Sequence, residues 1–481
     1  MVVNKMKVIK NYLYNAGYQI LLMLVPLITV PYVSRVLGAY GSGVNSYTNS
    51  FVTFFYLAGQ LGITLYGNRQ IAYFQNNRFK RSVEFWSIIL LQLITSSIAF
   101  ILYLLIIPIL KSSFQKYYFF QSLWIISTGI DISWYFMGIE DFKKTVMRNT
   151  IVKIMTIICI FVFVRSSKDL GIYIILLGIA QVGGSLTLWP YLRDSIMKIP
   201  FSYLHPFKHF LPALMLFIPT ITSQIYLVIN RLMLGSMSTQ VKLGQFDYSD
   251  KIVKLVLALV TASGTVMLPH MANKYAKKDF KGINISLYNS FDFVTALSVP
   301  LMFGLMAISE KFAPWFLGEQ YVSTGNIILF EAPIIFIISW SVVSGMQYLI
   351  PIKKVHEYTF SVIVGAVINV IANVVLISRY SANGAAIATV ISETVITILQ
   401  LYFMKDKIKL RNIFYGIWKY FLSGLIMFVV VKNLNIYLKF NFLTFIFEVV
   451  IGIVIYVICL IVFRAKILDQ LTNLTNKVKI Q

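Results

Sequence analysis

The chain has 481 residues, of which 58% are hydrophobic and only 12% are charged, and its mean hydropathy is +0.76. Soluble globular domains carry charge on about a quarter of their residues, so this composition excludes an ordinary soluble protein. A formal net charge of +24 would suggest a nucleic-acid partner for a soluble chain, but in a membrane protein its meaning depends on where the basic residues lie.

Apolar runs of about 20 residues recur along the chain, and each is long enough to cross a hydrocarbon core of about 30 Å. Because a backbone in lipid must satisfy its hydrogen bonds internally, we predict an all-α integral membrane protein with about fourteen transmembrane helices. We expect two six-helix lobes around a central cavity (residues 1–200 and 201–404), followed by two more helices and a tail (405–481). The predicted spans are 12–33, 43–65, 84–107, 117–138, 150–164, 172–192, 211–230, 246–269, 287–308, 324–346, 358–378, 383–404, 414–431 and 442–463.

The N-terminal segment has Lys5, Lys7 and Lys10 ahead of a long apolar run. This run is too long for a signal-peptide core and lacks a small-residue cleavage site, so we predict that it is retained as the first span. Lysine and arginine are concentrated in alternate connections, which places both termini in the cytoplasm. Most of the positive charge is therefore a topology signal, and nucleic acid is not an expected partner.

Two similar blocks occur in the two predicted lobes. Pro26 is followed by "SRVLG" and "YTNSFV", and Pro219 is followed by "NRLMLG" and "YSDKIV". Both blocks start on the same predicted side of the membrane, which indicates a parallel repeat. A proline inside a helix bends it, so Pro26 and Pro219 are either hinges of moving lobes or static kinks.

Four charges open the predicted span 246–269, which is otherwise apolar. Asp247, Asp250, Lys251 and Lys254 fall within an arc of about 100° on one helix face. A charge at the bilayer centre costs about 3 kcal/mol, which favours a water-filled cavity beside this face. Alternatively, the two i, i+4 acid–lysine pairs neutralise each other at the interface.

Other charges also lie in or near the predicted spans. Arg35 and Arg231 occupy matching places in the two blocks, so they either bind a phosphate from two sides or are ordinary interfacial arginines. Asp131 is deep within 117–138 and is either a proton or sodium site or a residue that pairs helices. Lys153 lies near the end of a predicted span, where its amino group can reach the interface.

The sequence lacks the common catalytic and metal-binding motifs. It contains no Walker A motif, no H-E-x-x-H, no nucleophile elbow and no metal-spaced cluster of its two cysteines and four histidines. The connections on the predicted outer side are too short to hold a catalytic domain. We therefore expect a transporter rather than an enzyme, with no cofactor and no metal, and with coupling to a proton or sodium gradient left open.

Four blocks resemble the recurring segments of bacterial Wzx-type oligosaccharide flippases. These flippases belong to the superfamily that also includes the MATE exporters and the lipid II flippase. The resemblance runs from about Lys7 to Met404. The blocks are "NYLYNAGYQILLMLVPLITVPYVSRVLGAYGSGVNSYTNSF", "DISWYFMGIEDFKKTVMRN", "YSDKIVKLVLALVTASGTVMLPHMA" and "NGAAIATVISETVI".

The resemblance implies transfer of an undecaprenyl pyrophosphate-linked oligosaccharide to the outer leaflet of a bacterial plasma membrane, by alternating access around a cationic cavity. The product would serve capsule, exopolysaccharide or O-antigen synthesis, with other polysaccharide assembly proteins as candidate partners. Lys251, Lys254 and Arg231 would line the cavity. Basic groups can compensate a pyrophosphate in a low dielectric, and polar walls suit the sugars. The candidate sugar-binding residues are Asn15, Gln19, Tyr47 and Asn49.

Two other functions are compatible with the sequence. A MATE-like exporter of organic cations would share the fold, but it predicts an acidic cavity, whereas the basic candidates here include Arg35, Arg231 and Lys251. A membrane-bound sugar polymerase or ligase would need a large external loop with catalytic side chains. The sign of the charge in the cavity distinguishes the flippase from the exporter.

Overall fold

Helices make up the regular structure of the chain. The computed structural model describes the backbone of residues 2–470, and it describes the side chains in that range apart from those of 2–23, 142–143, 218–220, 222–223, 225–227 and 262–266. No strand occurs in the described backbone. This confirms the all-α prediction, as expected where lipid leaves no water to satisfy an open strand edge.

The chain forms two compact units, Met1–Gly235 and Ser236–Gln481, and the boundary falls inside helix α9. The predicted lobe limits at residues 200 and 404 stay a prediction. The helices of the N-terminal unit are α1 (Val2–Gln60), α2 (Ile63–Tyr73), α3 (Arg78–Ile109), α4 (Gln115–Gln121), α5 (Leu123–Ile130), α6 (Ser133–Gly138), α7 (Phe142–Phe163), η1 (Ser167–Asp169), α8 (Leu170–Leu186), η2 (Trp189–Leu192), η3 (Phe201–Tyr203), η4 (Pro206–His209) and α9 (Phe210–Met237).

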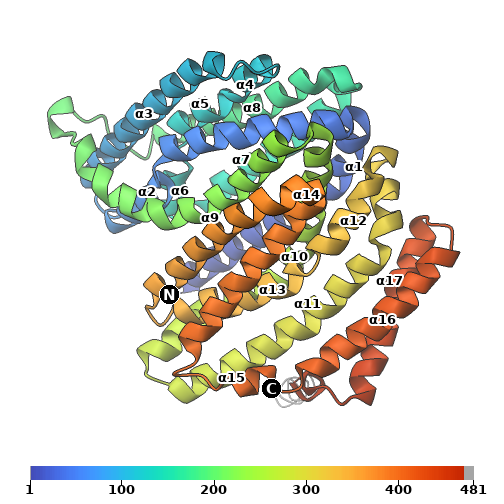
Figure 1. Cartoon of the computed structure of the whole chain (residues 1–481). Helices are drawn as coiled ribbons and strands as arrows, with labels where there is room; N and C mark the ends of the chain where they lie inside the picture. Colours follow the sequence, from blue (N-terminus) through green and yellow to red (C-terminus); the bar gives the residue numbers. More distant parts are fainter. Residues whose placement is uncertain (1, 471–481) are drawn as a thin grey trace. The chain divides into compact units, whose positions relative to one another are not determined.

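The C-terminal unit continues with long helices interrupted by short irregular segments (Figure 1). One of these segments is a π-helix, η6, which directly follows α13. The elements are α10 (Gln240–Ala276), α11 (Phe280–Leu317), η5 (Glu319–Tyr321), α12 (Val322–Glu331), α13 (Ile334–Ser341), η6 (Val342–Leu349), α14 (Val355–Met404), α15 (Leu410–Phe414), α16 (Ile417–Tyr437) and α17 (Phe442–Val462).

Several helices have the length and composition of membrane spans. Within the described residues eight helices qualify, or nine if the two segments Glu319–Glu331 and Ile334–Leu349, bent by 44°, form one span. Two of the eight are 50-residue segments, Leu24–Tyr73 and Val355–Met404, and each overlaps two predicted spans. A multi-pass membrane protein is thus confirmed, and the structure is consistent with the expected count of about fourteen spans.

Sharp breaks divide the two longest helices. Helix α1 is interrupted at Gly38, where φ is 67°, and α14 is interrupted at Ser381, where φ is 52°. Both breaks fall in the short gaps between predicted spans, and a positive φ ends the regular helix there. Pro26 lies inside α1 rather than at its break. Its hinge role stays a prediction, and Pro219 falls outside the residues whose side chains are described.

The core of the N-terminal unit is rich in aromatic residues from α3 and α6. Trp134 and Tyr135 of α6 pack against Phe85 of α3, and the indole nitrogen of Trp134 donates to Oε1 of Gln92 at 3.0 Å. Gly62, with φ of 69°, precedes α2, and a β-carbon there would lie 2.9 Å from the backbone oxygen of Ala213 in α9. Glycine is therefore required for the close approach of α2 and α9.

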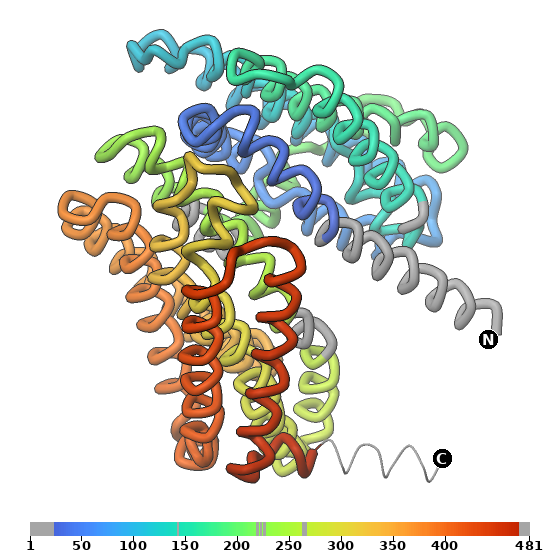
Figure 2. The backbone as a smooth tube through the Cα atoms, turned by 90° about the vertical axis from the view of Figure 1, so that its right-hand side faces the viewer, coloured from blue at the N-terminus to red at the C-terminus, as the bar shows by residue number. Residues whose placement is uncertain are grey.

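The last two long helices belong to the C-terminal unit. Figures 1 and 2 show α16 and α17 as an antiparallel pair, and α16 packs along α11. Glu448 of α17 is buried and accepts hydrogen bonds from the Asn435 amide of α16. The other face of α17 exposes apolar side chains, including Ile453 and Ile461, as expected for a helix in contact with lipid.

Candidate functional site

The charged stretch singled out in the sequence begins about two turns inside α10 and contains two ion pairs. Nζ of Lys251 lies 2.6 Å from Oδ2 of Asp247, and Nζ of Lys254 lies 2.7 Å from Oδ1 of Asp250. The predicted i, i+4 pairing is thus confirmed. In both pairs the acid precedes the lysine, which is the favourable order along a helix.

Burial separates the two signs of charge within this stretch. The aspartate side chains are buried, whereas the side chains of Lys251 and Lys254 are 43% and 35% exposed. The Lys251 amino group also lies 4.7 Å from the centre of the Tyr248 ring, within range of a cation–π contact. The surface that this part of α10 presents is therefore cationic, although its lysines are ion-paired.

A third carboxyl group lies behind these pairs. Glu331, at the end of α12, is fully buried and accepts a hydrogen bond from the Ser249 hydroxyl at 2.6 Å. Asp250 and Lys254 lie within electrostatic reach of the same carboxyl group. The sequence alone does not single out Glu331, because its contact with α10 joins residues 82 positions apart.

The two predicted arginines have different surroundings. Arg35 is an exposed residue of α1, and its guanidinium donates to the backbone oxygen of Pro31 at 3.4 Å. Arg231 is half-buried on α9. Both residues belong to the unit Met1–Gly235. A shared phosphate site between Arg35 and Arg231 stays a prediction.

The predicted sugar-binding residues of α1 are only partly described. Asn49 donates from its amide to Oε1 of Gln121 in α4 at 3.3 Å, so this side chain joins two helices. Tyr47 is half-buried against the cluster that includes Tyr118. The side chains of Asn15 and Gln19 fall outside the described residues. For Tyr47 and Asn49, contact with a sugar stays a prediction.

Asp131, the other candidate for ion coupling, connects the end of α5 to α6 and α7. Its carboxylate accepts hydrogen bonds from the backbone nitrogen and hydroxyl of Ser133, at 3.1 and 2.8 Å. Its Oδ1 also lies 3.7 Å from the guanidinium of Arg148 in α7. These contacts are typical of a residue that pairs helices, one of the two roles left open by the sequence.

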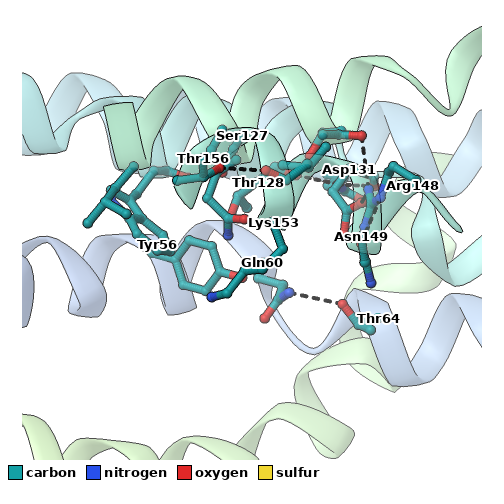
Figure 3. A pocket seen from close by; sticks show the side chains of 18 residues that line it. Tyr56, Gln60, Thr64, Ser127, Thr128, Asp131, Arg148, Asn149, Lys153 and Thr156 are labelled. Atoms are coloured by element: carbon teal, nitrogen blue, oxygen red, sulfur yellow. Dashed lines mark hydrogen bonds and ion pairs between the residues drawn. The ribbon is translucent and has the colours of Figure 1, made fainter. Parts of the chain in front are cut away.

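Asp131 also lines a cavity of about 350 Å³ that lies within the N-terminal unit (Figure 3). Polar side chains from several helices converge on it, together with two aromatic rings. The labelled residues in the figure are Tyr56, Gln60, Thr64, Ser127, Thr128, Asp131, Arg148, Asn149, Lys153 and Thr156. The sequence reading did not predict this cavity.

One signal in the sequence could have revealed the cavity. Five residues of α7 line it, and their spacing places them on one face of the helix: Arg148, Asn149, Val152, Lys153 and Thr156. The predicted span began at residue 150, whereas α7 begins at Phe142. Lys153 is consequently in the middle of the helix, and the expectation that it lies near a span end is corrected.

Across the residues with described positions, no three histidine, cysteine, aspartate or glutamate side chains lie together in a way that could hold a metal ion. The cationic face of α10 and the cavity of the N-terminal unit contain ion pairs and polar side chains. These interactions suit the binding of charged and hydroxyl-rich ligands.

Comparison with known proteins shows the family. The family described as "Polysaccharide biosynthesis protein" matches residues 8–275, more than half of the chain. A protein of Escherichia coli (strain K12) named "Putative O-antigen transporter" is 22% identical over 410 residues, which cover 84% of this chain and 98% of that protein. The "Lipid II flippase MurJ" of Bacillus subtilis (strain 168) is 26% identical over 145 residues, 30% of this chain and 26% of that protein.

Solved structures show the same fold at low sequence identity. The lipid II flippase MurJ in an inward closed conformation has a TM-score of 0.72 at 18% identity, covering 95% of this chain and 99% of that chain. An inward-facing MATE multidrug transporter has a TM-score of 0.61 at 13% identity, covering 85% and 99%. The structural likeness shows a shared fold, and the family match confirms the predicted family: the chain belongs to the polysaccharide biosynthesis protein family.

Proposed function

We propose that the chain is a flippase for lipid-linked oligosaccharides. Its substrate would be an undecaprenyl pyrophosphate-linked repeat unit, moved from the inner to the outer leaflet of a bacterial plasma membrane for capsule, exopolysaccharide or O-antigen synthesis. The family match over residues 8–275 carries this proposal. The multi-pass helical fold, shared with a lipid II flippase, supports it.

The chemistry of the cationic face on α10 suits the headgroup of such a substrate. A pyrophosphate that enters a low-dielectric region needs positive charge and hydrogen-bond donors close by. The amino groups of Lys251 and Lys254 provide this charge and these donors, because the lysine side chains are partly exposed while their partner aspartates are buried. In the other unit, Arg231 has a guanidinium that can donate two hydrogen bonds to a phosphate. The polyprenyl tail can remain in lipid during the transfer.

Transport by alternating access requires that the binding site open first toward one leaflet of the membrane and then toward the other. In our proposal both termini are cytoplasmic, as the distribution of lysine and arginine predicts. Pro26, Pro219 and the break at Gly38 are candidate points of bending. Coupling to a proton or sodium gradient stays open. The candidate residues are Asp131, which lines the cavity of the N-terminal unit, and Asp247 and Asp250, which are buried acids beside the cationic face.

Deletion of the gene in the producing bacterium tests this function. Lipid-linked repeat units are expected to accumulate in the inner leaflet, and surface polysaccharide is expected to disappear. Expression of the wild-type chain in the deletion strain should restore export. Normal surface polysaccharide without accumulation would contradict the proposal, and efflux of organic cations by the same strain's wild-type protein would instead favour an exporter of the MATE type.

A further inference from the structure

The cavity of the N-terminal unit contains an ammonium group that has no counterion among the residues whose side chains the structure describes. Lys153 lines the cavity, and it forms no hydrogen bond or ion pair with any residue that the structure describes. Arg148, the other cation of the cavity, lies 3.7 Å from the Asp131 carboxylate and donates to the backbone oxygen of Gly184. The lining therefore has two positive charges and one negative charge.

Access to the membrane surface does not explain the position of Lys153. The residue is 10 or more positions from both ends of α7, which span Phe142–Phe163, so it lies roughly 15 Å from each end of the helix. A lysine stem cannot extend that far to an interface. Figure 3 shows its side chain within the cavity, in the neighbourhood of Tyr56 and Gln60 of α1.

Two further groups in the lining are buried hydrogen-bonding atoms. The indole nitrogen of Trp124 has no hydrogen-bond partner among the residues that the structure describes, and the buried Oγ1 of Thr128 lies beside the Tyr56 hydroxyl. Thr128 as a whole is only 3% exposed. A buried donor left unsatisfied is costly, so a bound ligand that reaches the Trp124 indole nitrogen is stabilised by it.

The remaining lining has the composition of a carbohydrate site. The rings of Tyr56 and Trp124 can cover the apolar face of a pyranose, and the amides of Gln60, Asn149 and Gln181 can bond its hydroxyl groups. The volume of about 350 Å³ is within the range of small-molecule pockets and accommodates a single sugar residue.

We propose that this cavity binds one sugar residue that carries a single carboxylate, a hexuronic acid, with the Lys153 ammonium as its counterion. A monoanion balances the one uncompensated charge of the lining, whereas a diphosphate would bring more negative charge than the cavity can neutralise. The inference rests on the proposed function, since it assigns a subsite for an acidic sugar of the transported glycan. The proposed subsite lies entirely within the unit Met1–Gly235.

Calorimetric titration of the detergent-purified full-length protein tests the site with three probes: glucuronate, glucose and inorganic pyrophosphate. We expect glucuronate to bind about twofold to fivefold more tightly than glucose, the effect of one partly exposed charge pair. Lys153→Met should abolish this preference. Lys144→Met is the matched control on the same helix, because Lys144 is paired with Asp141 at 3.1 Å outside the cavity and should leave the preference intact.

A second variant separates the site from general effects on folding. Thr128→Val keeps the shape of the side chain but removes its hydroxyl. It should weaken the binding of glucose and of glucuronate by the same factor, so the preference for glucuronate should remain. Equal binding of the two sugars to the wild-type protein would overturn the proposal. A preference that survives Lys153→Met, or tighter binding of pyrophosphate than of glucuronate, would also overturn it.

The titration uses no lipid-linked substrate, so its outcome is independent of transport. Preferential binding of glucuronate without accumulation of repeat units in the deletion strain would contradict the flippase function alone. Accumulation in that strain without a preference for glucuronate would contradict the acidic-sugar subsite alone.

Discussion

Replacing Lys254 with methionine is expected to destabilise the protein by about 2 to 3 kcal/mol, because it removes the cation that serves two buried carboxyl groups. Nζ of Lys254 lies 2.7 Å from the Asp250 carboxylate, and Glu331 is within electrostatic reach of both. Two unit charges at this distance interact by about 6 kcal/mol at an effective dielectric constant of 20 and by about 1.5 kcal/mol in water. The Lys254 side chain is 35% exposed, so the expected value lies between these limits and nearer to the lower one.

The assay is unfolding by SDS in mixed micelles, followed by circular dichroism. Lys251→Met is the matched control, since Lys251 has the same spacing to its aspartate on the same helix but is not within reach of Glu331. We expect this control to cost about 1 kcal/mol. Adding Asp250→Asn to Lys254→Met should recover most of the loss, because the buried negative charge is then also removed.

Two outcomes would refute this reasoning. One is an equal loss of stability in Lys254→Met and Lys251→Met, which would mean that Glu331 does not interact with the Lys254 pair. The other is a double variant whose loss is the sum of the two single losses, which would mean that Lys254 and Asp250 are not coupled.

Three other predictions concern packing, pH and export. Gly62→Ala should cost about 3 kcal/mol through its positive φ and the clash with Ala213, whereas Gly183→Ala, with open space around it, should be neutral or stabilising in the same unfolding assay. Burial lowers the pKa of His209 in the folded protein to about 4, so only the unfolded chain gains a proton as the pH falls below about 6.5. The free energy of unfolding should therefore drop by up to about 2 kcal/mol from pH 7 to pH 5. His209→Gln should remove this drop. Arg231→Ala should lower polysaccharide export at least about fivefold at unchanged abundance in the membrane, and wild-type export would show that Arg231 does not contact the headgroup.

Much of the fold follows from patterns that are local in the sequence. The length of the apolar runs predicts the helices, and the i, i+4 spacing of Asp247 with Lys251 predicts their ion pair, because both depend only on the geometry of one helix. The position of the break in α1 was harder to predict from the sequence. A proline is a visible signal for a bend, but the observed break is at Gly38, where the need for a positive φ arises from the reversal between two spans.

The contacts between helices could not be predicted from a single sequence. Glu331 looks like an isolated charge until α12 places it beside Ser249, and Lys153 looks like an interfacial lysine until the start of α7 is known. Likewise the sequence does not show that His209 is buried, with its Nδ1 2.7 Å from the Tyr66 hydroxyl. In each case the missing information is which helix faces which, a property of packing that the hydrophobic pattern leaves undetermined.

Transfer of a lipid-linked oligosaccharide between leaflets in reconstituted vesicles tests the central claim most directly. Vesicles that contain the purified protein and a fluorescent undecaprenyl pyrophosphate-linked oligosaccharide are treated with a quencher that reaches only the outer leaflet. We predict that the wild-type chain exposes the inner-leaflet lipid far faster than protein-free vesicles do, and that a variant combining Arg231→Ala with Lys251→Ala is at least about tenfold slower. Equal rates with and without the protein would contradict the flippase function, and a full rate in the variant would contradict the role of these basic groups.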